Sequence, residues 1–459
     1  MTTSPRVREP RRGRFGAMLR APALALIATC LCAGRAEAQF GFGQAVGGIA
    51  IDAAGIVSSL EPAALEALAA ERQAAVADMH GPAAAGGLRK VSLRRIVAAV
   101  DRFAADGTPL PTDVLFLGGL ERITHVFVDP DGHDIILAGP ADKATIGPGG
   151  AVVAAASGRS LLQLEDLIVA LRSIDGARQG GMTCSIDPTA EGLKKLRGYL
   201  GGLKTIGQDP SVVFRGMETA LGPQVVTVGG VPAESRFARV LVAADYRMKR
   251  IGMGLEPSGV KGLPSYIDMV PPGAKASTLP RFWLEADYEP LARDADELAW
   301  RIGDRRMRCL TENDALAKDG VQRGAGGVDK TAQRWCDAMT EHYDELAKEQ
   351  PVFADLVNCV DLAVVAALIR GRQLDARAGL DLGALVDAEA LSLPSYDAPR
   401  QVPTIANGVK KGTTWVLSAS GGVRFQAWQF AAQADEDADV AEARSLALAA
   451  RPNAEWWWD

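Results

Sequence analysis

The sequence contains 459 residues, of which 48% are hydrophobic and 23% charged, and its formal net charge is −6. This composition is ordinary for a globular protein and excludes a wholly disordered chain. A net-acidic chain without a long basic run also lacks the clustered Lys and Arg that bind nucleic acid phosphates or anionic membrane surfaces.

The first 38 residues have the three parts of a secretory signal peptide. The positively charged start carries Arg6, Arg8, Arg11, Arg12, Arg14 and Arg20. The apolar stretch at 21–34 is shorter than the roughly 20 residues that a membrane anchor needs. Ala36-Glu37-Ala38 fits a signal peptidase site. We therefore predict cleavage near Ala38, export to the periplasm or the cell exterior, and no transmembrane segment in the mature chain.

Removal of this segment changes the charge of the protein. Residues 1–38 contain seven Arg and two Glu, a net charge of +5, so the 421 residues from Gln39 onward carry about −11. That length suffices for two or three subdomains. The order of the predicted elements suggests an N-terminal α+β region at 39–180, a middle α+β region at 181–325 and a C-terminal region at 326–459.

Hydrophobic periodicity predicts three helices and one hairpin in the N-terminal region. The helices lie at 62–79, after the N-cap Ser92 and at 164–172. The hairpin joins strands at 123–128 and 135–138 through the turn sequence Asp129-Pro-Asp-Gly132.

In the middle region we expect a helix after Pro188, a strand at 224–228, a long helix at 233–251 and a hairpin at 298–311 that turns at Gly303-Asp304.

The C-terminal region is predicted to contain a helix pair and a hairpin. The first helix carries apolar residues at helical spacing: Trp335, Met339, Tyr343 and Leu346. The second starts at Pro351 and is apolar on nearly every side, so it should be a buried core helix. The hairpin joins Thr414–Ser420 to Val423–Phe430 through Gly421-Gly422. The predicted fold class is α+β, with amphipathic helices interleaved with short antiparallel hairpins.

Four cysteines remain after signal cleavage: Cys184, Cys309, Cys336 and Cys359. In an oxidising compartment they are disulfide candidates with three possible connectivities, and buried thiols are the alternative. Their wide spacing excludes a CxxC redox site and a zinc knuckle.

Five stretches together resemble a known family. They are 158–172, 184–189, 239–250, 339–347 and 420–423. On these stretches the chain resembles an uncharacterised exported-protein family of planctomycete bacteria, a domain of unknown function. The resemblance implies export and bacterial origin, and it implies no catalytic residue.

Carboxylates suggest one weak catalytic hypothesis. Glu285, Asp287 and Glu289 alternate on a strand-like segment beside Trp283 and Tyr288, as the acids of a glycosidase cleft do. An exposed strand face gives the same pattern without function. Histidines lack metal-ligand spacing, and the Asp129–Asp134 turn lacks the spacing of a calcium loop, so no metal or cofactor is expected.

Two further sets of residues are ligand-binding candidates. The opposite face of the 233–251 helix carries Arg236, Arg239, Arg247 and Arg250. These arginines suit an anionic ligand or partner, and a solvated helix face is the alternative. Trp456 and Trp458 share a face of an extended strand, where they either stack on a sugar or anchor the C-terminus in the core.

The leading functional hypothesis is an exported, non-catalytic envelope or extracellular protein that binds a partner protein or polymer. The alternative is a secreted hydrolase of polysaccharide or peptide that uses carboxylates of the 285–289 segment.

Overall fold

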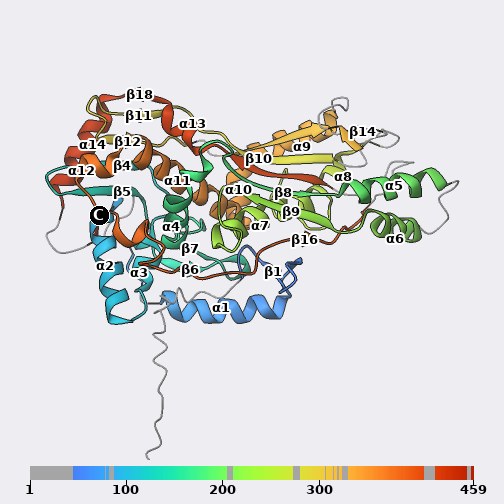
Figure 1. Cartoon of the computed structure of the whole chain (residues 1–459), viewed down its shortest axis with the longest axis horizontal. Coiled ribbons are helices and arrows are strands. Elements are labelled where there is room, and N and C mark those ends of the chain that lie inside the picture. Colours follow the sequence, from blue (N-terminus) through green and yellow to red (C-terminus); the bar gives the residue numbers. More distant parts are fainter. Residues whose placement is uncertain are drawn as a thin grey trace, which may run out of the picture. The chain divides into compact units, whose positions relative to one another are not determined.

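The computed structural model describes residues 45–77, 79–81, 87–203, 210–271, 280–304, 307–313, 315–317, 320–322, 329–407, 419–451 and 456–459. The predicted signal peptide at 1–38 lies outside these residues. The chain from Ala36 onward clusters into one compact unit, which mixes helices with sheets of two to seven strands. The predicted α+β class is therefore confirmed (Figure 1).

The largest sheet has seven strands, in the order β18-β11-β12-β4-β5-β3-β19. In that order the strands cover Ala434–Glu436, Leu291–Arg293, Ala299–Arg301, His125–Asp129, Asp134–Pro140, Leu88–Ser92 and Trp457–Trp458. β4 and β5 form the predicted hairpin, in which Asp129 pairs with Asp134 across the turn. Strands from all three sequence regions take part in this sheet.

A second sheet has six strands, in the order β13-β10-β17-β8-β9-β16. They cover Met307–Asn313, Pro280–Ala286, Ser420–Phe425, Met182–Asp187, Gln224–Gly229 and Gln401–Val402. β10 and β17 pair in parallel, and the other neighbours are antiparallel.

The hairpin predicted at 298–311 is wrong. β12 pairs with β4 and β11 in the seven-stranded sheet, whereas β13 pairs with β10 in the six-stranded sheet. The segment between them therefore leads the chain from one sheet to the other. The sequence predicts both strands, but β12 pairs with β11 and with the distant β4, and β13 pairs with β10.

The hairpin predicted around Gly421-Gly422 is also wrong. Both glycines lie inside β17, and the helix α13 (Ala427–Ala432) follows. The first strand of the predicted hairpin, Thr414–Ser420, lies mostly outside the described residues. A Cβ at Gly421 would lie 1.8 Å from the carbonyl oxygen of Phe282, and one at Gly422 would lie 1.9 Å from that of Cys184. The pair is needed for close approach of neighbouring strands, not for a turn.

The helix α11 (Val352–Gly371) lies at the centre of the helical contacts. It packs against α4 (Leu164–Ser173), α7 (Arg236–Gly252), α10 (Tyr343–Glu349), α12 (Leu374–Ala378) and α13, and α7 in turn packs on β8 and β17 (Figure 1). α11 is long and apolar enough to cross a membrane, but its whole apolar window is buried inside the protein. The buried core helix predicted after Pro351 is therefore confirmed.

The other helices are α1 (Pro62–Val76), α2 (Leu93–Asp106), α3 (Thr112–Leu115), α5 (Ala190–Gly202), α6 (Pro210–Leu221), α8 (Tyr266–Met269), α9 (Lys330–Glu341) and α14 (Ala438–Ala449). The short helices η1–η4 cover Leu117–Gly119, Pro148–Gly150, Gly176–Arg178 and Gly383–Leu385. Three two-stranded sheets pair β1 (Ile49–Ile51) with β2 (Val57–Ser59), β6 (Ala144–Ile146) with β7 (Val152–Ala154), and β14 (Ala315–Ala317) with β15 (Gly320–Gln322).

Gly422→Ala should destabilise the protein, because the added methyl group meets the rigid backbone of β8. We expect a loss of roughly 2–3 kcal/mol in the free energy of unfolding, measured by urea titration. The matched control is Gly198→Ala on α5, where a Cβ meets nothing within 4 Å. That substitution should stabilise the protein by about 0.5 kcal/mol. Equal effects of the two changes would contradict the strand assignment.

Candidate functional site

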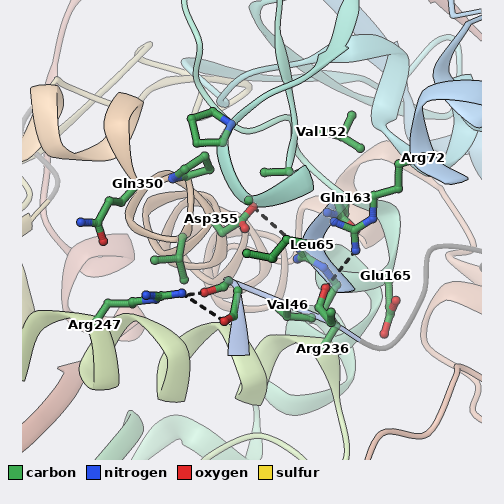
Figure 2. Close-up of a pocket in the computed structure, with 18 of the residues that line it drawn as sticks. Val46, Leu65, Arg72, Val152, Gln163, Glu165, Arg236, Arg247, Gln350 and Asp355 are labelled. Atoms are coloured by element: carbon green, nitrogen blue, oxygen red, sulfur yellow. Dashed lines mark hydrogen bonds and ion pairs between the residues drawn. The ribbon is translucent and has the colours of Figure 1, made fainter. Parts of the chain in front are cut away.

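A cavity of ≈ 180 Å³ lies among the N-terminal segment 45–48 and the helices α1, α4, α7 and α11 (Figure 2). Its wall is partly apolar, with Val46, Leu65, Leu115, Phe116, Val152 and Val352. Its main polar groups are Arg72, Glu165, Arg236, Arg247, Asp355 and Tyr396. The combination of an apolar wall with a few converging polar groups is typical of a small-molecule site.

Arg236 is the first residue of α7, and its side chain is almost completely buried. Ser235 caps the helix by accepting the Ala238 N–H at 3.1 Å. The guanidinium forms ion pairs with Asp166 of α4 and, at 3.3 Å, with Asp355 of α11. Burial alone would lower the pKa of Arg236, but these carboxylates raise it. The charged side chain therefore joins three helices at the cavity wall.

Glu165 lies in the first turn of α4, beside this ion-pair network, and is only 4% exposed. The Tyr396 hydroxyl donates a hydrogen bond to its Oε2 at 3.0 Å, while Oε1 is buried without a hydrogen-bonding partner. Burial, together with repulsion from Asp166, raises the pKa of Glu165 to about 8. The cavity thus presents a carboxyl group that holds its proton at neutral pH.

The other two cavity arginines hold the N-terminal segment in place. Arg72 of α1 donates to the carbonyl oxygen of Ala45 at 2.9 Å. Arg247 of α7 donates to the carbonyl oxygen of Gly48 at 3.0 Å and forms an ion pair with Glu256. An anion entering the cavity would have to compete with these partners.

The predicted basic face of α7 is divided between the cavity and the core. Arg236 and Arg247 line the cavity. Arg239 is buried, with its guanidinium 4.9 Å from the ring centroid of Tyr396, and Arg250 pairs with Glu256. A solvated basic face is therefore absent, because acids and carbonyls from other elements meet these guanidinium groups.

The predicted carboxylates of β10 and the residues after it do not line the cavity. Glu285 forms ion pairs with Arg308 at 2.8 Å and Arg424 at 3.1 Å. Asp287 lies 3.9 Å from the same Arg308, and Glu289 is exposed. Two arginines thus bind Glu285, one of the three carboxylates of the hydrolase hypothesis.

The terminal tryptophans lie at the edge of the seven-stranded sheet. Trp458 is buried and donates its indole N–H to the carbonyl oxygen of Ala447 at 3.2 Å, while Trp456 is half-buried. The neighbouring Asp459 forms an ion pair with the buried Arg89 at 2.9 Å. These contacts hold Trp458 and Asp459 against the rest of the protein.

The four cysteines are buried thiols, and none lines the cavity. In the part of the chain that the structure describes, no group of three His, Cys, Asp or Glu side chains is arranged to hold a metal ion. The carboxylates of Asp129 and Asp134, at the turn considered for calcium, both form ion pairs with Arg451.

One stretch of the chain matches a known family model. Residues 184–266, from β8 to the start of α8, match the profile of a family described as proteins of unknown function, DUF1598. This stretch contributes Arg236 and Arg247 to the cavity. No curated protein and no solved structure matches the chain.

Glu165, Asp355 and Tyr396 are cavity residues that the sequence did not suggest. Glu165 was placed on a predicted amphipathic helix, where an acidic residue in the first turn is expected for helix stability alone. Asp355 offered a clearer signal, because it interrupts the apolar start of α11. Such a buried charge needs a partner, which only the fold supplies.

Arg236→Met should be strongly destabilising, because it leaves Asp166 and Asp355 buried without their cation. We expect a loss of roughly 3–5 kcal/mol in the free energy of unfolding by urea titration. Arg250→Met on the same helix is the control; its partner Glu256 keeps Arg247, so the loss should stay below about 1 kcal/mol. Similar losses would show that the Arg236 network does not support the helices.

Glu165 should make the folded state less stable as the pH rises. Its folded pKa of about 8 lies above its ordinary value of 4.5, so between these pH values the folded protein holds a proton that the unfolded chain has lost. We expect the wild type to lose roughly 4 kcal/mol more than Glu165→Gln between pH 5 and pH 8.5, measured by urea unfolding. Equal losses would place the Glu165 pKa near its ordinary value.

Proposed function

We propose that this chain is an exported bacterial protein that binds, without chemical conversion, a small molecule with an apolar body and one hydroxyl or amine group. The N-terminal signal pattern supports export. The observation that carries the binding site is the buried carboxyl group of Glu165, which lines a cavity and has one oxygen, Oε1, without a partner in the protein. Because Glu165 is neutral and Tyr396 donates to Oε2, the carboxyl proton lies on Oε1. A buried polar atom without a partner is costly, and a ligand hydroxyl or amine group that supplies the partner removes that cost.

The size and wall of the cavity define the ligand further. Cavities of about 150 Å³ hold a molecule the size of benzene, so ≈ 180 Å³ suits a single ring or a short branched chain. Leu65, Phe116 and Val152 offer such a body apolar contacts. An alcohol or amine group would face Glu165, whereas Arg236 and Arg247 already bind carboxylates.

Catalysis is the second candidate function, because a carboxyl group protonated at neutral pH suits a general acid. A glycosidase also needs a second carboxylate across its substrate. Asp355 is a second carboxylate in the cavity, but Arg236 binds it. Glu285, Asp287 and Glu289 lie elsewhere. The arrangement therefore favours binding over hydrolysis.

Benzyl alcohol, benzylamine and toluene test the proposal by ligand-observed NMR titration of the purified protein. We expect the alcohol or the amine to bind about tenfold more tightly than toluene, as one additional hydrogen bond allows. Glu165→Leu should remove this preference. Ala151→Phe, which fills the cavity, should abolish binding, while Ala155→Phe on the exposed turn nearby should not.

Equal binding of the three probes, or binding that survives Ala151→Phe, would contradict the proposed site. Turnover of nitrophenyl glycosides or peptide anilides that Glu165→Gln abolishes would instead establish the catalytic alternative.

A further inference from the structure

Two of the four cysteines lie in contact, away from the cavity. Cys309 of β13 and Cys336 of α9 have their sulfur atoms 3.4 Å apart, and both side chains are buried. Thr340 holds the strand and the helix in this register. Its Oγ1 accepts the backbone N–H of Cys309 at 2.9 Å and donates to the carbonyl oxygen of Cys336 at 2.9 Å. The backbone therefore fixes the approach of the two thiols.

The other two cysteines have different surroundings. Cys184 of β8 lies near the buried pair Asp245–Lys249, and Cys359 of α11 donates its thiol to Asp166. Each of these thiols thus belongs to a polar network of its own. Of the connectivities that four cysteines allow, the fold brings together the partners of one bridge.

We propose that Cys309 and Cys336 form a disulfide in the exported protein, while Cys184 and Cys359 remain thiols. A bond of about 2.05 Å requires only small side-chain rotations from the observed contact. One thiolate attacks a disulfide oxidant, either a small-molecule disulfide or a disulfide oxidoreductase, and forms a mixed disulfide. The second thiolate then displaces the oxidant's sulfur. The two cysteines lose two protons and two electrons, and the oxidant leaves as two thiols.

The bridge must form before β13 and α9 finish packing. Burial raises the pKa of the Cys309 thiol, so the folded protein contains little of the reactive thiolate. Once formed, the bridge ties α9 to an edge strand, because β13 is the first strand of the six-stranded sheet. It also closes the connection that carries β14 and β15, which limits the freedom of the unfolded chain.

The test compares the purified mature chain, from Gln39 onward, refolded with glutathione disulfide and with dithiothreitol. Each sample is denatured under non-reducing conditions, alkylated with N-ethylmaleimide and digested for peptide mass mapping. After oxidative refolding we expect Cys184 and Cys359 to carry the alkyl group and the peptides of Cys309 and Cys336 to be linked. Alkylation of both Cys309 and Cys336, or a bridge that includes Cys184 or Cys359, would overturn the proposal.

Thermal unfolding provides a second measurement. The melting temperature of the oxidised protein should exceed that of the reduced protein by roughly 4 °C. Cys336→Ala should lose this dependence on reductant, whereas Cys184→Ala should keep it. A reductant effect that persists in Cys336→Ala would contradict the assignment. Because neither cysteine lines the cavity, these results are independent of ligand binding.

Discussion

The ion pairs of Arg236 with Asp166 and Asp355 link three helices in a region where most neighbouring side chains are apolar. Three charges in such surroundings are stable only together, because each loses its hydration on burial. Their geometry therefore constrains how α4, α7 and α11 meet. It also accounts for Glu165, which lies next to Asp166 but has no cation of its own. The raised pKa of Glu165 follows first from its burial and then from repulsion by Asp166, and the charge of Arg236 offsets only part of it.

The two large sheets complete this arrangement through pairings distant in sequence. β12 pairs with β4 of the β4–β5 hairpin, and in the other sheet β17 lies between β8 and β10. Lys249 connects α7 to that sheet, because its ammonium group donates to Asp245 and to the carbonyl oxygens of Ile186 and Gly421. Gly421-Gly422 lets β17 approach its neighbours closely enough for this contact. The helix α7, which carries Arg236 and Arg247, is therefore fixed by α4 and α11 on one side and by the six-stranded sheet on the other.

Features fixed by neighbouring residues could be predicted from the sequence. The Ser92 cap of α2 and the β4–β5 turn are of this kind, since Ser92 accepts the Arg95 N–H and Asp129 accepts the Gly132 N–H. Gly421-Gly422 shows the limit, because two glycines serve a tight turn and a crowded strand equally well. Arginine spacing on α7 was equally ambiguous. A helical pattern places the four arginines on one face, but only the fold shows that buried acids meet them.

The surroundings of the Glu165 carboxyl group decide between a binding site and a catalytic site. A general acid must release its proton to a substrate and then be recharged, which a second ionised group or a water usually assists. Tyr396 donates a hydrogen bond to one oxygen of Glu165. Asp166 and Asp355 form ion pairs with Arg236, so neither is available to exchange a proton with Glu165. The remaining oxygen, Oε1, carries the carboxyl proton and has no partner in the protein, which favours recognition of a ligand hydroxyl or amine group. Burial raises the pKa of Glu165 and so keeps its carboxyl group neutral at pH 7. An uncharged alcohol can therefore bind in the cavity without a change in the charge of Glu165.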